Sequence, residues 1–142
     1  MPEGCEIPLH NATSEEIRAL LQSVRTIAVV GLSDKPERDS YHVAVYLQKH
    51  GYRIIPVNPA VSEVLGEKAY ASLRDVPDKI DMVDIFRRPD AVPAIVEDAI
   101  AVGARTVWMQ EGIVHNAAAD MARAAGLHVV MNKCMLKEHA RL

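Results

Sequence analysis

Three helix-like segments of this sequence each end at a glycine that leads directly into a short run of branched apolar residues. The three glycines are Gly51, Gly103 and Gly126. Glycine is favoured at this position because the residue that closes a helix commonly takes a left-handed conformation. The runs that follow are rich in Val and Ile and do not alternate with polar residues, as in strands buried on both faces. The repeated pattern therefore predicts helices that alternate with the strands of a parallel sheet.

Five apolar runs are the expected strands, and they cover residues 26–30, 53–57, 80–86, 106–109 and 127–131. Helices are expected at residues 40–50, 89–102 and 116–125, with a helical turn at 72–76 and a short final helix at 135–142. Thr13 and Glu16 form a capping-box pattern at the start of an earlier helix. The sequence predicts an α/β fold, a Rossmann-like doubly wound parallel sheet with the strand order 3-2-1-4-5.

Length and composition limit the class of protein. A chain of 142 residues is expected to form a single domain, 1–142, with residues 1–12 as a loose N-terminal arm. A net charge of -3 argues against a general nucleic-acid surface. The N-terminus has acidic residues and no apolar run, and no stretch approaches the roughly 18 apolar residues of a membrane span. Cys5 and Cys134 lack metal or CxxC spacing, which fits a cytoplasmic protein with free thiols.

Basic residues follow several of the expected strands. They are Lys35, Arg38, Arg87, Arg88 and Lys133. Parallel strands end at one edge of the sheet, and a ligand binds there at the switch point, which the predicted order places between the first and fourth strands. An acidic protein with cations along one edge is a candidate anion binder. The alternative is a set of ordinary solvated surface charges.

The loop after the first strand has the groups of a phosphate site. Gly31 permits a close approach to the backbone, and Ser33 supplies a hydroxyl. Lys35 and Arg38 supply charge, and Ser40 begins a helix whose first amides favour phosphate. The loop lacks the GxGxxG fingerprint and the chain has no Walker A motif. A plain polar connection between strand and helix remains the alternative.

Two further strand ends narrow the choice of ligand. Val57-Asn58-Pro59 follows the second strand without the acidic residue that NAD-binding proteins use for the ribose hydroxyls. This argues against NAD, leaves NADP open and leaves room for a phosphorylated ribose. Gln110 follows the fourth strand and can bond an amide such as those of a pantetheine arm, and Gly112 permits close backbone approach.

Taken in order, several motifs resemble the CoA-binding protein family, small proteins similar to the CoA-binding domain of the succinyl-CoA synthetase alpha subunit. The resemblance extends over about residues 16–142. The motifs are Val29-Val30-Gly31-Leu32-Ser33, Lys35-Pro36, Ile55-Pro56-Val57-Asn58-Pro59, Asp84-Ile85-Phe86-Arg87, Trp108-Met109-Gln110-Glu111-Gly112 and Asn132-Lys133-Cys134.

The resemblance implies that coenzyme A is the ligand and assigns residues to its parts. The phosphates would lie at Gly31, Ser33, Lys35 and Arg38, and the nucleotide wall at Val57, Asn58 and Pro59. Phe86 and Arg87 would lie by the adenosine, and Gln110 and Gly112 by the pantetheine. In two respects the sequence departs from the family: no phosphohistidine domain follows, so we do not expect ligase activity, and Asn132 stands where an aspartate is expected.

No arrangement of catalytic residues is evident, so the sequence favours a CoA or acyl-CoA binding protein, such as a carrier or sensor, over an enzyme. One alternative is an enzyme that acts on a CoA thioester or disulfide through Cys134 or His115. Another is an NAD(P)-linked regulatory domain that works through a partner. The amphipathic first helix can cover a sheet edge, meet a second subunit in a homodimer, or meet an unidentified protein.

Overall fold

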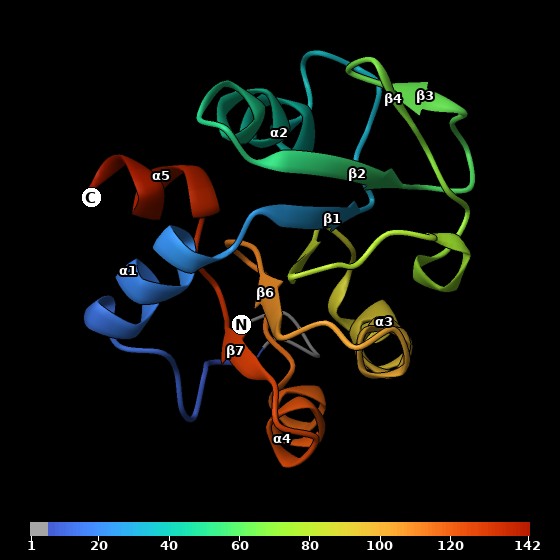
Figure 1. The fold of residues 1–142 in the computed structure, drawn as a ribbon. Helices are drawn as coiled ribbons and strands as arrows, with labels where there is room; N and C mark the ends of the chain where they lie inside the picture. Colours follow the sequence, from blue (N-terminus) through green and yellow to red (C-terminus); the bar gives the residue numbers. More distant parts are fainter. Residues whose placement is uncertain (1–5) are drawn as a thin grey trace.

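A five-stranded parallel sheet with helices on both faces forms the centre of the computed structural model, which describes residues 6–142 (Figure 1). Its strands are β1 (Thr26–Val30), β2 (Arg53–Val57), β5 (Met82–Ile85), β6 (Thr106–Met109) and β7 (His128–Val130). Every neighbouring pair is parallel. The predicted α/β class and the number of strands in this sheet are confirmed.

The predicted strand order is wrong. The observed order is β2-β1-β5-β6-β7, so the third strand of the sheet in sequence pairs with β1, and not with β2. In the register, Ile27 lies opposite Met82 and Val30 lies opposite Ile85. The switch point therefore lies between β1 and β5, the first and third strands, and not between the first and fourth.

The reason for this order lies in the connection after β2. Helix α2 (Asp39–Lys49) joins β1 to β2 on one face, whereas the 3-10 turn η1 (Leu73–Asp75) packs in the core of the opposite face. Right-handed crossovers on opposite faces carry the chain in opposite directions along the sheet. The chain therefore returns past β1. The sequence of residues 60–78 has no clear helical stripe, so it did not show which face this connection covers.

One face of the sheet is covered by α1 (Ser14–Ser23), α2 and α5 (Met135–Ala140) (Figure 1). The predicted capping box at the start of α1 is confirmed. Thr13 Oγ1 accepts from Glu16 N at 3.1 Å, and Glu16 Oε1 accepts from Thr13 N at 2.9 Å. The core under these helices includes the fully buried Trp108, whose Nε1 donates to Lys133 O.

The other face is covered by α3 (Val92–Ala101), which follows the 3-10 turn η2 (Pro89–Ala91), and by α4 (Asn116–Ala124) (Figure 1). A small hairpin of β3 (Glu63–Val64) and β4 (Glu67–Lys68) lies outside the main sheet. The sheet thus separates two apolar cores, and its five strands end along one edge.

The described part of the N-terminal arm lies against the rest of the protein. Asn11 Nδ2 donates to Met131 O at 2.8 Å, and Met131 N donates to Asn11 Oδ1 at 3.0 Å. Glu6 Oε1 accepts from the backbone and side chain of Asn116 at the start of α4. Between residues 6 and 142, no helix has the length and apolar character that crossing a membrane requires.

Candidate functional site

Gly31 stands at the switch point, directly after β1. Its φ of +90° lies in the left-handed region, and its N–H donates to Val57 O at 2.8 Å. A Cβ at this position would overlap the carbonyl oxygen of Phe86 and lie 3.0 Å from Arg87 Cδ. The backbone of β1 and the end of β5 therefore approach each other so closely that only glycine fits between them.

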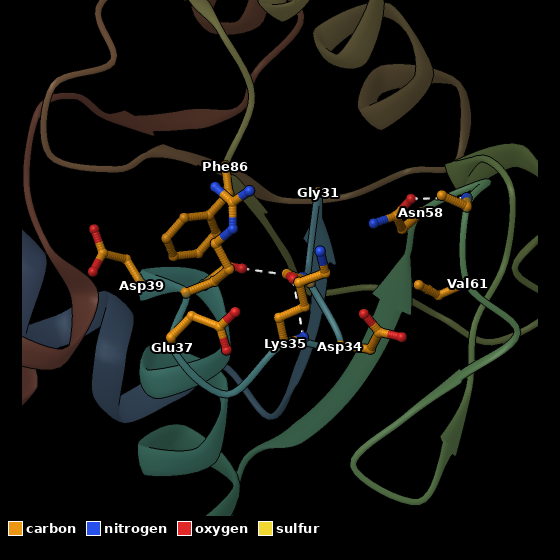
Figure 2. Close-up of a pocket in the computed structure, with 12 residues that line it drawn as sticks. Gly31, Asp34, Lys35, Glu37, Asp39, Asn58, Val61 and Phe86 are labelled. Atoms are coloured by element: carbon orange, nitrogen blue, oxygen red, sulfur yellow. Dashed lines mark hydrogen bonds between the residues drawn. The ribbon is translucent and has the colours of Figure 1, made fainter.

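A cleft of about 630 Å³ opens above Gly31, and we call it the loop cleft. Figure 2 shows Phe86 and Asn58 on opposite sides of Gly31, which follows from the positions of β5 and β2 on either side of β1. The lining residues come from the β1–α2 loop, the end of β2 and the end of β5. They are Gly31, Ser33, Asp34, Lys35, Glu37, Arg38, Asp39, Ser40, Asn58, Ala60, Val61 and Phe86.

The β1–α2 loop is held in shape by its own serines. Ser40 Oγ accepts from Ser33 N at 3.0 Å, and Ser33 Oγ accepts from Lys35 N at 3.1 Å. Arg38 occupies the N-cap position of α2. An arginine side chain has no acceptor, so the first amides of α2 stay available to another partner. The loop cleft thus combines helix amides, a glycine backbone and two cations.

Acidic side chains share the loop cleft with these cations. Asp34, Glu37 and Asp39 line it beside Lys35 and Arg38, and all five residues are exposed. Formal charge therefore does not make this cleft a strong attractor of anions. An anion bound here would depend on the directed backbone amides of α2 as much as on the side-chain charges.

A second cleft of about 360 Å³ adjoins the first, and we call it the thiol cleft because Cys134 lines it. Both clefts include Phe86 and Asp39, so they meet at these two residues. The remaining lining residues are His42, Val43, Gln110, Glu111, Ile113, Cys134, Leu136 and Lys137. Apolar side chains make up much of this wall, in contrast to the polar loop cleft.

Gln110 is the most deeply buried polar residue of the thiol cleft. Its exposed fraction is 3%, and its Oε1 accepts from Met135 N at 3.4 Å. Within the described residues its Nε2 has no hydrogen-bond partner. A buried donor without a partner costs about 1–3 kcal/mol. Gln110 therefore lines this cleft with a buried N–H donor that lacks a partner among the described residues.

The rim of the thiol cleft carries an ion pair. Lys137 Nζ lies 3.0 Å from Glu111 Oε1 and 3.1 Å from Glu111 Oε2. The hydrogen bond and the charge of Glu111 raise the pKa of Lys137, and Cys134 adds a smaller contribution in the same direction. Lys137 is therefore paired with the carboxylate, and it lines the same cleft as Cys134.

Of the residues expected from the sequence to bind a ligand, the structure brings Gly31, Ser33, Lys35, Arg38, Asn58 and Phe86 to the loop cleft and Gln110 to the thiol cleft. The remaining four lie outside both linings. Val57 is buried in the core, and Pro59 is exposed beyond the end of β2. Arg87 covers Gly31 with its side chain. Gly112 N donates to Asn132 Oδ1 at 2.7 Å, so this amide already has a partner.

Asn132 and His115, which the sequence singled out, have structural roles. Asn132 has a left-handed φ of 59°, which asparagine tolerates, and it shapes the loop after β6 through its bond to Gly112. His115 is the N-cap of α4, where its Nδ1 accepts from Ala118 N at 3.1 Å. His115 is not among the residues that line either cleft.

Sequence reasoning missed several lining residues. Val61 reaches the loop cleft from the chain after β2, whereas His42, Ile113 and Lys137 reach the thiol cleft from α2, the β6–α4 loop and α5. None of these four residues directly follows a strand of the main sheet, which is where the fold class predicts ligand contacts. The position of His42 one turn into a helix that begins at the switch point was the available signal.

Asp84 on β5 lies beneath this edge of the sheet, fully buried opposite Val29 and Trp108. Neither carboxyl oxygen has a hydrogen-bond partner among the described residues. Burial raises the pKa of Asp84 well above its ordinary value. The carboxyl therefore favours its neutral form in the folded protein.

The chain is similar to proteins from bacteria and archaea. It is 41% identical over 132 residues to the uncharacterized protein YneT of Bacillus subtilis, covering 93% of this chain and 98% of that protein. A solved structure of a hypothetical protein from Pyrococcus horikoshii OT3 is 46% identical, with a TM-score of 0.91 over 100% of this chain and 99% of that one.

A longer relative is an ADP-forming acetate–CoA ligase II of Archaeoglobus fulgidus. The match is 30% identical over 81 residues and spans 56% of this chain but 12% of the ligase. This chain therefore corresponds to a small part of that enzyme. Residues 25–140 match the CoA binding domain as a sequence family. This match includes both clefts, and it confirms the resemblance inferred from the motifs: the chain belongs to the CoA binding domain family.

Proposed function

We propose that this protein binds coenzyme A or an acyl-CoA, as a carrier or sensor. The observation that carries the proposal is the pair of clefts that meet at Phe86 and Asp39. One cleft is polar and faces helix amides, and the other is largely apolar and ends at a free amide donor and a thiol. CoA has the same division, with a phosphorylated nucleotide at one end and a pantetheine arm with a terminal thiol at the other.

The nucleotide end fits the loop cleft. The first amides of α2 would hold the pyrophosphate beside Gly31, where the lack of a side chain leaves room, with Lys35 and Arg38 as charge partners. Asp34 and Glu37 can accept hydrogen bonds from ribose or adenine donors. The mixed charge of this wall is thus compatible with a nucleotide, which carries donors as well as phosphates.

The end of β2 favours CoA over NAD. Asn58 lies where NAD-binding proteins carry an acid, and its side chain is already engaged in the loop. Asn58 Nδ2 donates to Leu32 O at 3.0 Å, and its Oδ1 accepts from Ala60 N at 2.9 Å. An amide at this position neither accepts from a ribose hydroxyl as a carboxylate does nor repels a ribose phosphate.

The pantetheine arm fits the thiol cleft. An arm that leaves the pyrophosphate would pass Phe86 and enter the apolar part formed by Val43, Ile113 and Leu136. Gln110 Nε2 would donate to an amide carbonyl of the arm, which satisfies a donor that otherwise lacks a partner among the described residues.

Isothermal titration with CoA, dephospho-CoA and NADP tests this proposal. CoA should bind most tightly, because dephospho-CoA lacks the ribose phosphate and NADP lacks the arm. Tighter binding of NADP than of CoA would favour an NADP-linked role, and no binding of CoA would refute the proposal. Native mass spectrometry of the freshly purified protein would show whether CoA or an acyl-CoA is carried from the cell.

A further inference from the structure

We propose that Cys134 is a site of covalent attachment, at which the protein captures the disulfide form of its ligand by thiol–disulfide exchange. This inference rests on the proposed function, since it requires the pantetheine arm to occupy the thiol cleft. It adds a reaction and a second ligand form, a disulfide of the CoA thiol, to reversible binding.

The position of Cys134 is the first support. Cys134 is half-buried, not paired in a disulfide, and forms part of the wall of the thiol cleft. This cleft meets the loop cleft at Phe86 and Asp39. A ligand with its phosphates at the β1–α2 loop would therefore direct the far end of its arm toward the wall that carries this thiol.

Gln110 gives independent support for a ligand beside Cys134. It lines the same cleft, is only 3% exposed, and has an Nε2 without a partner among the described residues. Its Oε1 accepts a hydrogen bond from the backbone N–H of Met135, the residue that follows Cys134. The same side chain thus anchors the backbone next to the thiol and leaves a donor for an arm in the cleft. An arm that reached this donor would lie beside the backbone that follows Cys134.

The wall around the thiol combines an ion pair with apolar side chains. Lys137, which pairs with Glu111, lines the same cleft as Cys134. The apolar Ile113 and Leu136 line it as well. A thiol in this wall is open to a ligand that occupies the cleft, and thiol–disulfide exchange proceeds by attack of a cysteine sulfur on a disulfide.

The reaction is balanced without an external oxidant. The Cys134 thiol loses its proton to solvent, and its sulfur attacks one sulfur of the symmetric disulfide of CoA. A bond forms between Cys134 Sγ and that sulfur, the original S–S bond breaks, and the second CoA leaves as a thiolate that takes up a proton. The disulfide of the substrate is exchanged for a mixed disulfide on the protein, and a free thiol reverses the step.

Intact-mass spectrometry and peptide mapping test the proposal with the full chain. The wild-type protein is incubated with the symmetric disulfide of CoA or with an equal concentration of glutathione disulfide. Because binding places the reacting sulfur at the cleft, Cys134 should be modified at least about tenfold faster by the CoA disulfide. Desulfo-CoA, which occupies the site but cannot react, should slow this modification.

Matched variants assign the reacting sulfur. Cys5→Ser should still form the adduct, whereas Cys134→Ser should form none that prefers the CoA disulfide or responds to desulfo-CoA. Peptide mapping of the wild-type chain gives the same assignment if Cys134→Ser does not fold. Equal rates with both disulfides, or no effect of desulfo-CoA, would overturn the proposal. If reduced CoA binds in titration but Cys134 is not modified, only this inference fails; if CoA does not bind, the proposed function fails.

Discussion

Replacement of Gly31 by alanine tests the geometry on which the loop cleft depends. Two separate effects are expected in Gly31→Ala. The φ of +90° is unfavourable for any residue with a Cβ, and the new methyl group would overlap the Phe86 carbonyl oxygen and approach its carbonyl carbon to 3.1 Å. The Arg87 side chain can move aside, but the two Phe86 atoms belong to the backbone of an adjacent strand end and cannot rotate away.

The size of each effect follows from the structure. A left-handed conformation costs a non-glycine residue about 1–2 kcal/mol. Overpacking against a rigid neighbour adds about 1–3 kcal/mol. Gly31→Ala should therefore lower the free energy of unfolding by about 2–5 kcal/mol. Any relief of the overlap must move β1 from the end of β5, which widens the switch point and should weaken CoA binding even where the protein stays folded.

Gly103→Ala is the matched control. Gly103 has a φ of +77°, and among the described residues no atom beyond its chain neighbours lies within 4 Å of the place that a new methyl group would take. Its loss should be limited to the conformational cost of about 1–2 kcal/mol. Urea unfolding followed by circular dichroism measures both variants, and titration with CoA measures binding. Equal losses in the two variants, or unchanged CoA affinity in Gly31→Ala, would refute the close approach of β1 and Phe86 as a determinant of the site.

Other substitutions probe the charges and donors of the two clefts. Lys35→Ala and Arg38→Ala should each weaken CoA binding by about fivefold at low salt and less at high salt, measured as Kd, because each removes one exposed charge. Gln110→Leu should weaken CoA binding by about tenfold and leave the affinity for adenosine 3′,5′-bisphosphate unchanged, since that ligand has no arm; equal losses for both ligands would contradict the assignment. Burial raises the pKa of Asp84, so the free energy of unfolding is highest below the ordinary aspartate pKa and falls as pH rises toward the raised value. The slope of this fall is up to about 1.4 kcal/mol per pH unit, and Asp84→Asn should remove it. An identical pH profile of stability in both proteins would show that Asp84 does not titrate in this way.

Local patterns in the sequence predicted most of the elements, because they depend on neighbours along the chain. The expected strands 26–30, 53–57 and 106–109 have the observed bounds, and the capping box at Thr13 is present. The expected strand 80–86 is shorter, at Met82–Ile85, because the chain bends at Asp81 before the strand and Phe86 lines the clefts after it. The strand order could not be obtained in this way, since it depends on which face the segment after β2 covers.

The candidate site shows the same division between local and long-range information. The sequence predicted four residues of the loop cleft, because all of them lie in the single loop after β1: Gly31, Ser33, Lys35 and Arg38. It predicted Gln110 because this residue directly follows a strand. His42 and Lys137 were missed, since helix side chains reach a cleft only once the packing of α2 and α5 is known. Gly112 was wrongly expected to be open to a ligand, because its amide donates to Asn132, 20 positions along the chain. No local sequence pattern predicts that contact.

The observed strand order explains why two clefts join into one site. Because β5 pairs with β1, Phe86 follows β5 directly beside Gly31, and Gln110 follows β6 on the next strand. With the order 3-2-1-4-5, β2 would separate Phe86 from Gly31, and Gln110 would lie on the far side of β1 from Phe86. The loop cleft and the thiol cleft would then share no wall. Residues 58–81 cross to the opposite face of the sheet. This crossover therefore allows one extended molecule to reach both Lys35 and Cys134.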